Sequence, residues 1–119
     1  MQLNPNDHRT YMYLGDLYVL RHEPQLADEA YTTAVKLAPE SEAVLNLAIF
    51  YKYQGFNDEA RELYEKALLV HPDKAWAEIE FGMFLKRIGE IEPAREHFRE
   101  ALRIEPGYKQ AEILLDSLK

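Results

Sequence analysis

The residue types in this chain that could carry catalysis, or bind a metal or a phosphate, are histidine, the acidic residues and glycine. No histidine begins an HExxH motif, and the four stand at unrelated points of the chain, namely His8, His22, His71 and His97. Acidic pairs such as Glu96 and Glu100 are spaced i,i+4 beside arginines, which indicates solvated helix surfaces. The five glycines are isolated, so no phosphate-binding loop is seen. We predict a chain that is not an enzyme and binds no cofactor or metal.

The composition argues against several classes of partner. Fourteen Lys and Arg against twenty-one Asp and Glu give a formal charge of −7, which disfavours nucleic acid because basic side chains must neutralise its phosphates. The chain has no cysteine, and its longest apolar stretch, residues 44–51, is far shorter than the roughly 20 residues of a membrane span. No charged and apolar leader follows Met1. We expect a cytoplasmic protein that does not insert into a membrane.

Small and large side chains recur along the chain at a regular spacing. The central copy, residues 41–74, places in order Leu47, Ala48, Tyr51, Gly55, Ala60, Tyr64, Ala67, Val70 and Pro72. A similar series begins upstream at Leu14, with an offset of 33 (47 − 14), and downstream at Phe81, with an offset of 34 (81 − 47). A plain helical bundle needs only a period of about 3.6 residues, whereas an internal repeat of this length is typical of a solenoid.

This pattern resembles the tetratricopeptide repeat (TPR), a helix-turn-helix unit of about 34 residues. All three copies have small residues at the unit's positions 8, 20 and 27, which in the first copy are Gly15, Ala27 and Ala34. Small side chains at these places let two antiparallel helices approach to about 8–10 Å. Leu85 replaces an expected aromatic residue, and His22 replaces the turn glycine. The resemblance implies an all-α fold, a right-handed α-solenoid of three TPR helix-turn-helix repeats plus a C-terminal capping helix.

We expect a single TPR domain over residues 1–119. Its parts are the tail of a preceding repeat or a lead-in (1–7), repeat one (8–40), repeat two (41–74), repeat three (75–108) and the capping helix (109–119). Leu3 and Pro5 precede Leu37 and Pro39 by the same offset of 34 (37 − 3, 39 − 5), which favours a chain cut from a longer array over a natural start. Helices are expected at about His8–Arg21, Pro24–Leu37, Ser41–Gln54, Asn57–Val70, Lys74–Ile88, Ile91–Ile104 and Tyr108–Leu118.

The resemblance also implies a binding face. In the family, the first helix of each pair lines the concave surface, and many of the matching residues here are apolar. We expect this groove to bind a peptide through Met12, Tyr13, Asp16, Leu45, Asn46, Ile49, Tyr53, Trp76, Ile79, Glu80, Met83 and Arg87. Exposed apolar patches commonly mark interaction sites. The alternative is that superhelical curvature or self-contacts bury these residues.

We therefore predict a protein–protein interaction scaffold that binds a peptide or helix with apolar side chains. The carboxylate clamp of TPR chaperone adaptors grips an acidic tail, but at its positions only Asn46 matches, and Asp16 and Glu80 would repel such a tail. We expect the chain not to be a chaperone adaptor of that kind. Two alternatives stay open: a regulatory TPR segment of a larger enzyme, and a self-assembly module that self-associates through its N-terminal end or its groove.

Overall fold

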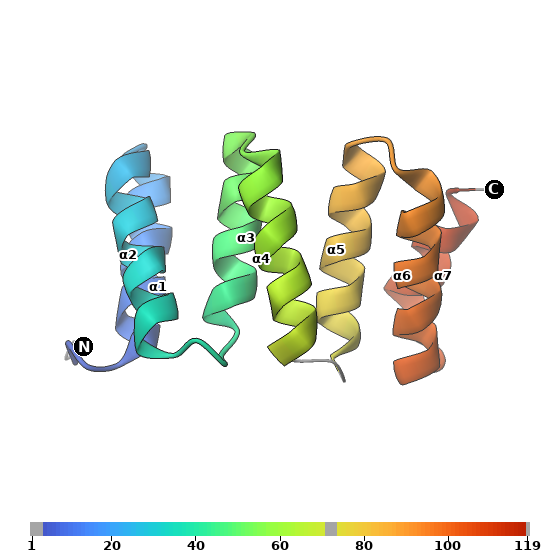
Figure 1. Cartoon of the computed structure of the whole chain (residues 1–119), viewed down its shortest axis with the longest axis horizontal. Helices are drawn as coiled ribbons and strands as arrows, with labels where there is room; N and C mark the ends of the chain where they lie inside the picture. The colour runs from blue at the N-terminus through green and yellow to red at the C-terminus, as the bar shows by residue number, and fades with distance from the viewer. Residues whose placement is uncertain (1–3, 71–73, 119) are drawn as a thin grey trace. The chain divides into compact units, whose positions relative to one another are not determined.

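The computed structural model of the chain describes residues 4–70 and 74–118. Within these residues every regular element is an α-helix (Figure 1), namely α1 (His8–Leu20), α2 (Pro24–Leu37), α3 (Ala43–Gln54), α4 (Asn57–Val70), α5 (Ala75–Arg87), α6 (Ile91–Ile104) and α7 (Lys109–Asp116). None of these helices has the length and apolar content to cross a membrane. The predicted all-α class is confirmed. Leu3, His71 and Pro72, which the sequence patterns used, lie outside the described residues.

The chain divides into two compact units, Met1–Leu63 and Tyr64–Lys119. The first unit holds α1, α2, α3 and the beginning of α4, and the second holds the rest of α4 with α5, α6 and α7. In unit 1, α1 packs along α2, and α3 contacts both of them. In unit 2, α5 packs along α6, and α6 also contacts α7 (Figure 1). Each unit is therefore built around a helix pair joined by a short turn.

The core of unit 1 forms where α2 meets α1 and α3. Buried side chains of α2 and α3 make a cluster of Ala27, Tyr31, Leu47 and Phe50, against which Tyr18, Val35, Tyr51 and Leu63 pack. The Tyr31 and Phe50 rings lie 5.2 Å apart between centroids. A Cβ atom at Gly15 would lie 2.6 Å from Cε1 of Tyr31. The glycine in α1 thus leaves the space that the Tyr31 ring fills.

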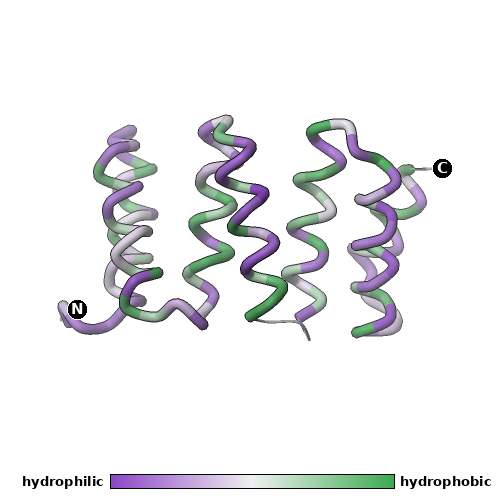
Figure 2. Tube along the Cα trace, in the orientation of Figure 1, coloured by the Kyte–Doolittle hydropathy of each residue, from purple (hydrophilic) through white to green (hydrophobic). Residues whose placement is uncertain are grey.

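The second unit repeats this arrangement with different aromatic residues. A Cβ atom at Gly82 of α5 would lie 2.5 Å from Cε1 of Phe98, which is fully buried in α6. Tyr64 of α4 stacks on Phe81 with 5.5 Å between ring centroids, and it lies 5.1 Å from Phe84. Polar residues dominate the rest of α6, as the purple tube in Figure 2 shows. Its apolar stripe is narrow and faces the core, as expected of an amphipathic surface helix.

The turn within each pair requires a left-handed backbone. Gly55 has φ +83° between α3 and α4, and Gly89 has φ +90° between α5 and α6. His22 occupies the same place between α1 and α2 with φ +59°. Left-handed φ values are uncommon for residues other than glycine because the Cβ atom crowds the backbone. The first turn therefore keeps the geometry of the others although it lacks the glycine.

Four helices are shorter than predicted. Helix α1 ends one residue early, at Leu20, and α5 is one residue shorter at each end, at Ala75 and Arg87. In α3 and α7 a serine side chain bonds to the backbone at the end of the helix. Ser41 was expected inside α3, but its Oγ accepts a hydrogen bond from the Ala43 amide at 3.1 Å and donates one to the Ala38 carbonyl at 2.7 Å. The helix therefore begins at Ala43. At the end of α7, Ser117 Oγ donates to the Leu114 carbonyl at 2.6 Å, and the helix ends at Asp116 rather than at Leu118. The predicted bounds of α2, α4 and α6 agree with the structure.

Candidate functional site

The expected binding face of unit 1 lies on α1 and α3, which contact each other. On α1, Tyr13 is 47% exposed and Met12 is half-buried. On α3, Asn46, Ile49 and Tyr53 are spaced i, i+3 and i+7 and so occupy one side of the helix. Asn46 and Ile49 are half-buried, whereas Tyr53 is 66% exposed. These residues combine partly exposed apolar surface with one amide group.

Leu45 and Ile79 were expected to line an exposed groove, and that expectation is wrong. Leu45 is 2% exposed and Ile79 is fully buried. The reason is that α3 and α5 carry buried residues nearly all round, including Val44 and Leu47 on α3 and Phe81 and Phe84 on α5. A helix that is apolar on every side is a core helix, so residues at a nominally outer position are also covered.

In the second unit, the expected face lies on α5. Trp76, Glu80 and Met83 are half-buried, and Arg87 is exposed. The Met83 sulfur lies 3.8 Å from Nε2 of Gln110 on α7, in a weak hydrogen bond. The expected face of this unit is therefore partly covered by its own last helix.

Asp16 is exposed, but its carboxylate already has an intramolecular partner. Tyr31 Oη on α2 donates a hydrogen bond to Asp16 Oδ1 on α1 at 2.5 Å. The same arrangement joins the next two helices, since Tyr51 Oη on α3 donates to Asp28 Oδ1 on α2 at 2.7 Å. Burial and the neighbouring carboxylate raise the pKa of both tyrosines, that of Tyr51 to about 12. Two tyrosine–aspartate bonds therefore link α1, α2 and α3.

These bonds predict a loss of stability in alkali. Because the pKa of Tyr51 is raised above its unfolded value of about 10, the contribution of its hydroxyl is fully present below about pH 10 and is lost as the pH rises through about 12. Melting curves followed by circular dichroism should therefore shift to lower temperature between these values. Tyr51→Phe and Asp28→Asn should each make this decline shallower. Identical declines in the wild type and in Tyr51→Phe would contradict the assignment.

His97 forms a polar contact that the sequence did not indicate. Its Nδ1 lies 2.6 Å from Glu78 Oε2, and its ring packs on Phe81 with 4.6 Å between centroids. Glu78 is 7% exposed and His97 is half-buried, so this pair joins α5 to α6. Among the described residues, no group of three or more His, Cys, Asp and Glu side chains is arranged to hold a metal ion.

The family follows from comparison with known proteins. A family model described as "Tetratricopeptide repeat" matches residues 40–105, which is more than half of the chain. The chain belongs to this family. The TPR residues singled out above take their expected places within the units, with Gly15 against Tyr31 and Gly82 against Phe98. A search of curated proteins finds no match.

Solved TPR structures share the fold at low sequence identity. The "First TPR of Spaghetti (RPAP3) bound to HSP90 peptide SRMEEVD" is 17% identical with a TM-score of 0.81, and the match covers 99% of this chain and 94% of that one. The TPR domain of Arabidopsis OM64 is 22% identical with a TM-score of 0.81, covering 96% and 95%. YrrB, described as "a TPR protein with an unusual peptide-binding site", is 23% identical with a TM-score of 0.80, covering 92% and 57%.

Proposed function

We propose that this chain is a protein-interaction module that binds a peptide or helix bearing apolar side chains on the expected face of unit 1. The observation that carries the proposal is the pair of exposed tyrosines, Tyr13 and Tyr53, on two helices that contact each other. Tyrosine offers a large contact area at low cost in conformational entropy and is common in binding hot spots. The half-buried Met12 and Ile49 would line the floor between them.

The Tyr53 ring is held in place by its own helix. Nζ of Lys52 lies 4.6 Å from the ring centroid, a distance at which a cation attracts the face of an aromatic ring. Lys52 itself is only 5% exposed, so the ammonium group is fixed by its surroundings. A ring that is ordered before binding loses little freedom when a ligand packs on it. Asn46, on the same side of α3, would hydrogen-bond the backbone of an extended ligand.

An acidic chaperone tail is a poor ligand for this face. The face carries Asp16, whose carboxylate accepts a hydrogen bond from Tyr31. The corresponding face of the second unit includes Glu80. Negative charges near the ligand would disfavour a carboxylate-rich tail. The expected face of the second unit is proposed to bind the same kind of ligand. It too combines apolar side chains, those of Trp76 and Met83, with a charged one, that of Arg87.

Peptide selection tests this proposal. A displayed library of random peptides is selected on the wild-type chain, and the affinities of the enriched peptides are measured by calorimetry. We expect sequences rich in Leu, Ile, Met and Phe. Tyr53→Ser and Tyr13→Ser should each weaken binding by about tenfold or more, because each removes a large contact, while stability should change by no more than about 0.5 kcal/mol because both sites are exposed.

Leu69→Ser provides the matched control. Leu69 is 84% exposed on α4 and lies outside the expected face, so this change removes exposed apolar surface without touching the proposed contacts. Binding should be unaltered. Equal losses in Leu69→Ser and Tyr53→Ser, or selection of acidic C-terminal tails instead of apolar sequences, would overturn the proposal.

A further inference from the structure

A groove in unit 1 lies beside the turns that follow α1 and α3. It consists of two adjacent hollows of about 440 Å³ and about 240 Å³. The smaller hollow is lined by Pro24, Gln25, Asp28, Phe50, Gln54 and Phe56. The larger one shares Pro24, Phe50 and Gln54 with it and also includes Glu23. Tyr13 and Tyr53 line neither hollow, so this turn groove is distinct from the proposed peptide face.

The smaller hollow has an aromatic wall that is partly open to solvent. Phe56 is 50% exposed, whereas Phe50 is 5% exposed. The Tyr51 ring packs against both, with centroid distances of 5.7 Å to Phe50 and 5.9 Å to Phe56. Its contact with Phe56 is edge-on, with 63° between the ring planes. Phe56 is therefore held by a neighbouring ring while part of its surface stays open to a ligand, and the face of an aromatic ring attracts cations.

The same hollow carries a carboxylate with one oxygen left for a ligand. Asp28 is half-buried, and its Oδ1 accepts hydrogen bonds from Thr32 Oγ1 at 3.1 Å and from Tyr51 Oη at 2.7 Å. Both bonds use Oδ1, so Oδ2 can accept from a further donor. The two bonds also fix the carboxylate before a ligand arrives, which lowers the cost of binding.

The charges around the turn groove favour a cationic ligand. Glu23 is half-buried in the larger hollow. Burial contributes most to raising the pKa of Tyr51 to about 12, followed by Asp28, and Glu59 adds to the effect, so a third carboxylate lies near the smaller hollow. Among the described residues, no Lys or Arg side chain lines either hollow. Such a lining repels the phosphates of nucleic acids and of anionic lipids and favours a basic side chain of a protein.

We propose that the smaller hollow binds the guanidinium group of an arginine in a partner protein, with apolar residues beside that arginine packing in the larger hollow. A guanidinium group is planar, so it can stack on Phe56 while it donates to Asp28 Oδ2. The amide oxygens of Gln25 and Gln54 would accept from its remaining N–H groups. Lysine would supply the charge but not the planar contact. The proposal is independent of the peptide face of α1 and α3.

A series of three capped peptides tests the ligand side. The probe is Ala-Leu-Arg-Leu-Ala, and its two relatives carry lysine or citrulline in place of arginine. Citrulline has nearly the same shape as arginine but no charge. NMR titration into the full chain should shift the signals of Gln54 and Phe56. The citrulline peptide should bind about tenfold more weakly than the arginine peptide, because it loses a hydrogen bond between charged groups. The lysine peptide should also bind more weakly, because it does not stack.

Variants of the chain test the site side. Asp28→Asn should weaken binding of the arginine peptide by about tenfold. If the carboxylate pairs with the guanidinium group, Asp28→Asn and citrulline together should weaken binding no more than either change alone. Tyr51→Phe removes a bond to Asp28 Oδ1 but keeps the carboxylate, so it should weaken binding by no more than about threefold, the share that comes from preorganisation. This variant separates loss of the charge from disturbance of the packing between α2 and α3.

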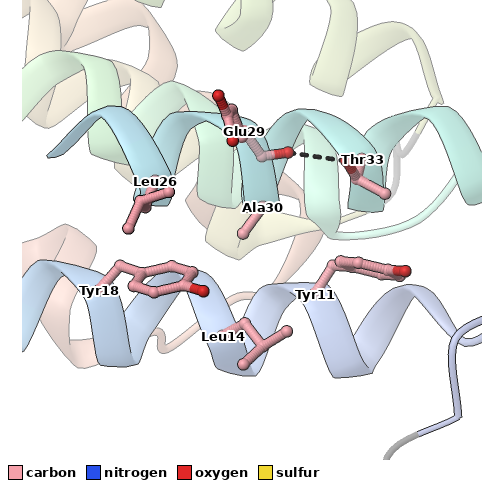
Figure 3. Close-up of a pocket in the computed structure, with 7 residues that line it drawn as sticks. All are labelled: Tyr11, Leu14, Tyr18, Leu26, Glu29, Ala30 and Thr33. Atoms are coloured by element: carbon pink, nitrogen blue, oxygen red, sulfur yellow. Dashed lines mark hydrogen bonds between the residues drawn. The ribbon is translucent and has the colours of Figure 1, made fainter. Parts of the chain in front are cut away.

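Glu29→Gln is the matched control. Glu29 is the next residue on α2 and is exposed, but it lines a different hollow of about 180 Å³ between α1 and α2 (Figure 3). The same loss of one negative charge should leave the affinity unchanged there. Tyr13→Ser, on the proposed peptide face, should also have no effect, so failure of this proposal is distinguishable from failure of the proposed function.

Four results would overturn the proposal. The first is absence of signal shifts at millimolar arginine peptide, and the second is equal affinity for the arginine and citrulline peptides. The third is an equal loss in Glu29→Gln and Asp28→Asn. The fourth is a dimer in sedimentation that Asp28→Asn dissociates, which would make a second copy of the chain the occupant. Circular dichroism checks the fold of each variant, and the peptide series on the wild type keeps the test valid if Asp28→Asn does not fold.

Discussion

Gly82→Val is expected to lower the free energy of unfolding by about 3 kcal/mol. A Cβ atom at this position would already lie 2.5 Å from the buried ring of Phe98, and valine adds two more methyl groups. Replacing glycine within an exposed helix usually stabilises, by up to about 1 kcal/mol, so a large loss can come only from overpacking, which typically costs about 1–3 kcal/mol. Urea unfolding followed by circular dichroism measures the difference.

Glu96→Val on α6 is the control for this prediction. Glu96 is exposed, so the change to valine should shift stability by no more than about 0.5 kcal/mol. Combining Gly82→Val with Phe98→Leu should recover part of the loss, because the smaller side chain leaves room for the new methyl groups. Strictly additive losses in the double variant would show that Gly82 and Phe98 are not in contact.

Tyr64→Ala is expected to lower the free energy of unfolding by about 4 kcal/mol. Truncating a buried aromatic side chain to alanine typically costs about 3–5 kcal/mol. Tyr64 is fully buried, and its ring packs on Phe81 and Phe84 of α5. The truncation therefore removes the side chain that joins α4 to α5 within unit 2. Hydrogen exchange should show the loss directly, with amide protection falling in α5.

Leu69→Ala tests whether this cost comes from burial. Leu69 lies on the same helix but is 84% exposed, so its truncation should cost no more than about 0.5 kcal/mol. If the two variants unfold at the same urea concentration, Tyr64 does not anchor α4 in the way the structure indicates.

The repeat pattern predicts much of the backbone because small residues and turns carry strong local signals. Helices α2, α4 and α6 begin and end where the sequence places them. Gly15 and Gly82 identify the close approach within the first and third pairs, since only glycine leaves space for the Tyr31 and Phe98 rings. The start of α3 was less predictable. The sequence around Ser41 fits a serine in the first turn of the helix and also a serine just before the helix, whose side chain bonds to the first amide groups.

The binding face was less predictable than the backbone. Leu45 and Ile79 were placed on it by repeat position alone, but their burial depends on how apolar the whole of α3 and α5 is. The bond from Tyr31 to Asp16 joins residues 15 positions apart, and its counterpart from Tyr51 to Asp28 spans 23 positions. Such pairs depend on the packing of two helices, and one sequence does not show which carboxylate a tyrosine reaches.

The connection between α2 and α3 bears on how repeat length can change. The step from Pro39 to Leu47 is eight residues (47 − 39), whereas that from Pro5 to Leu14 is nine (14 − 5). The missing residue is taken from the helix and not from the loop, since α3 has 12 residues whereas α1 and α5 have 13. Ser41 bonds to both Ala38 and Ala43 in the connection before α3, and α2 and α3 still pack through the Tyr31 cluster. The later start of α3 therefore accounts for the shorter step. The first turn of a helix between pairs is therefore a place where repeat length can change by one residue while the packed faces stay in phase.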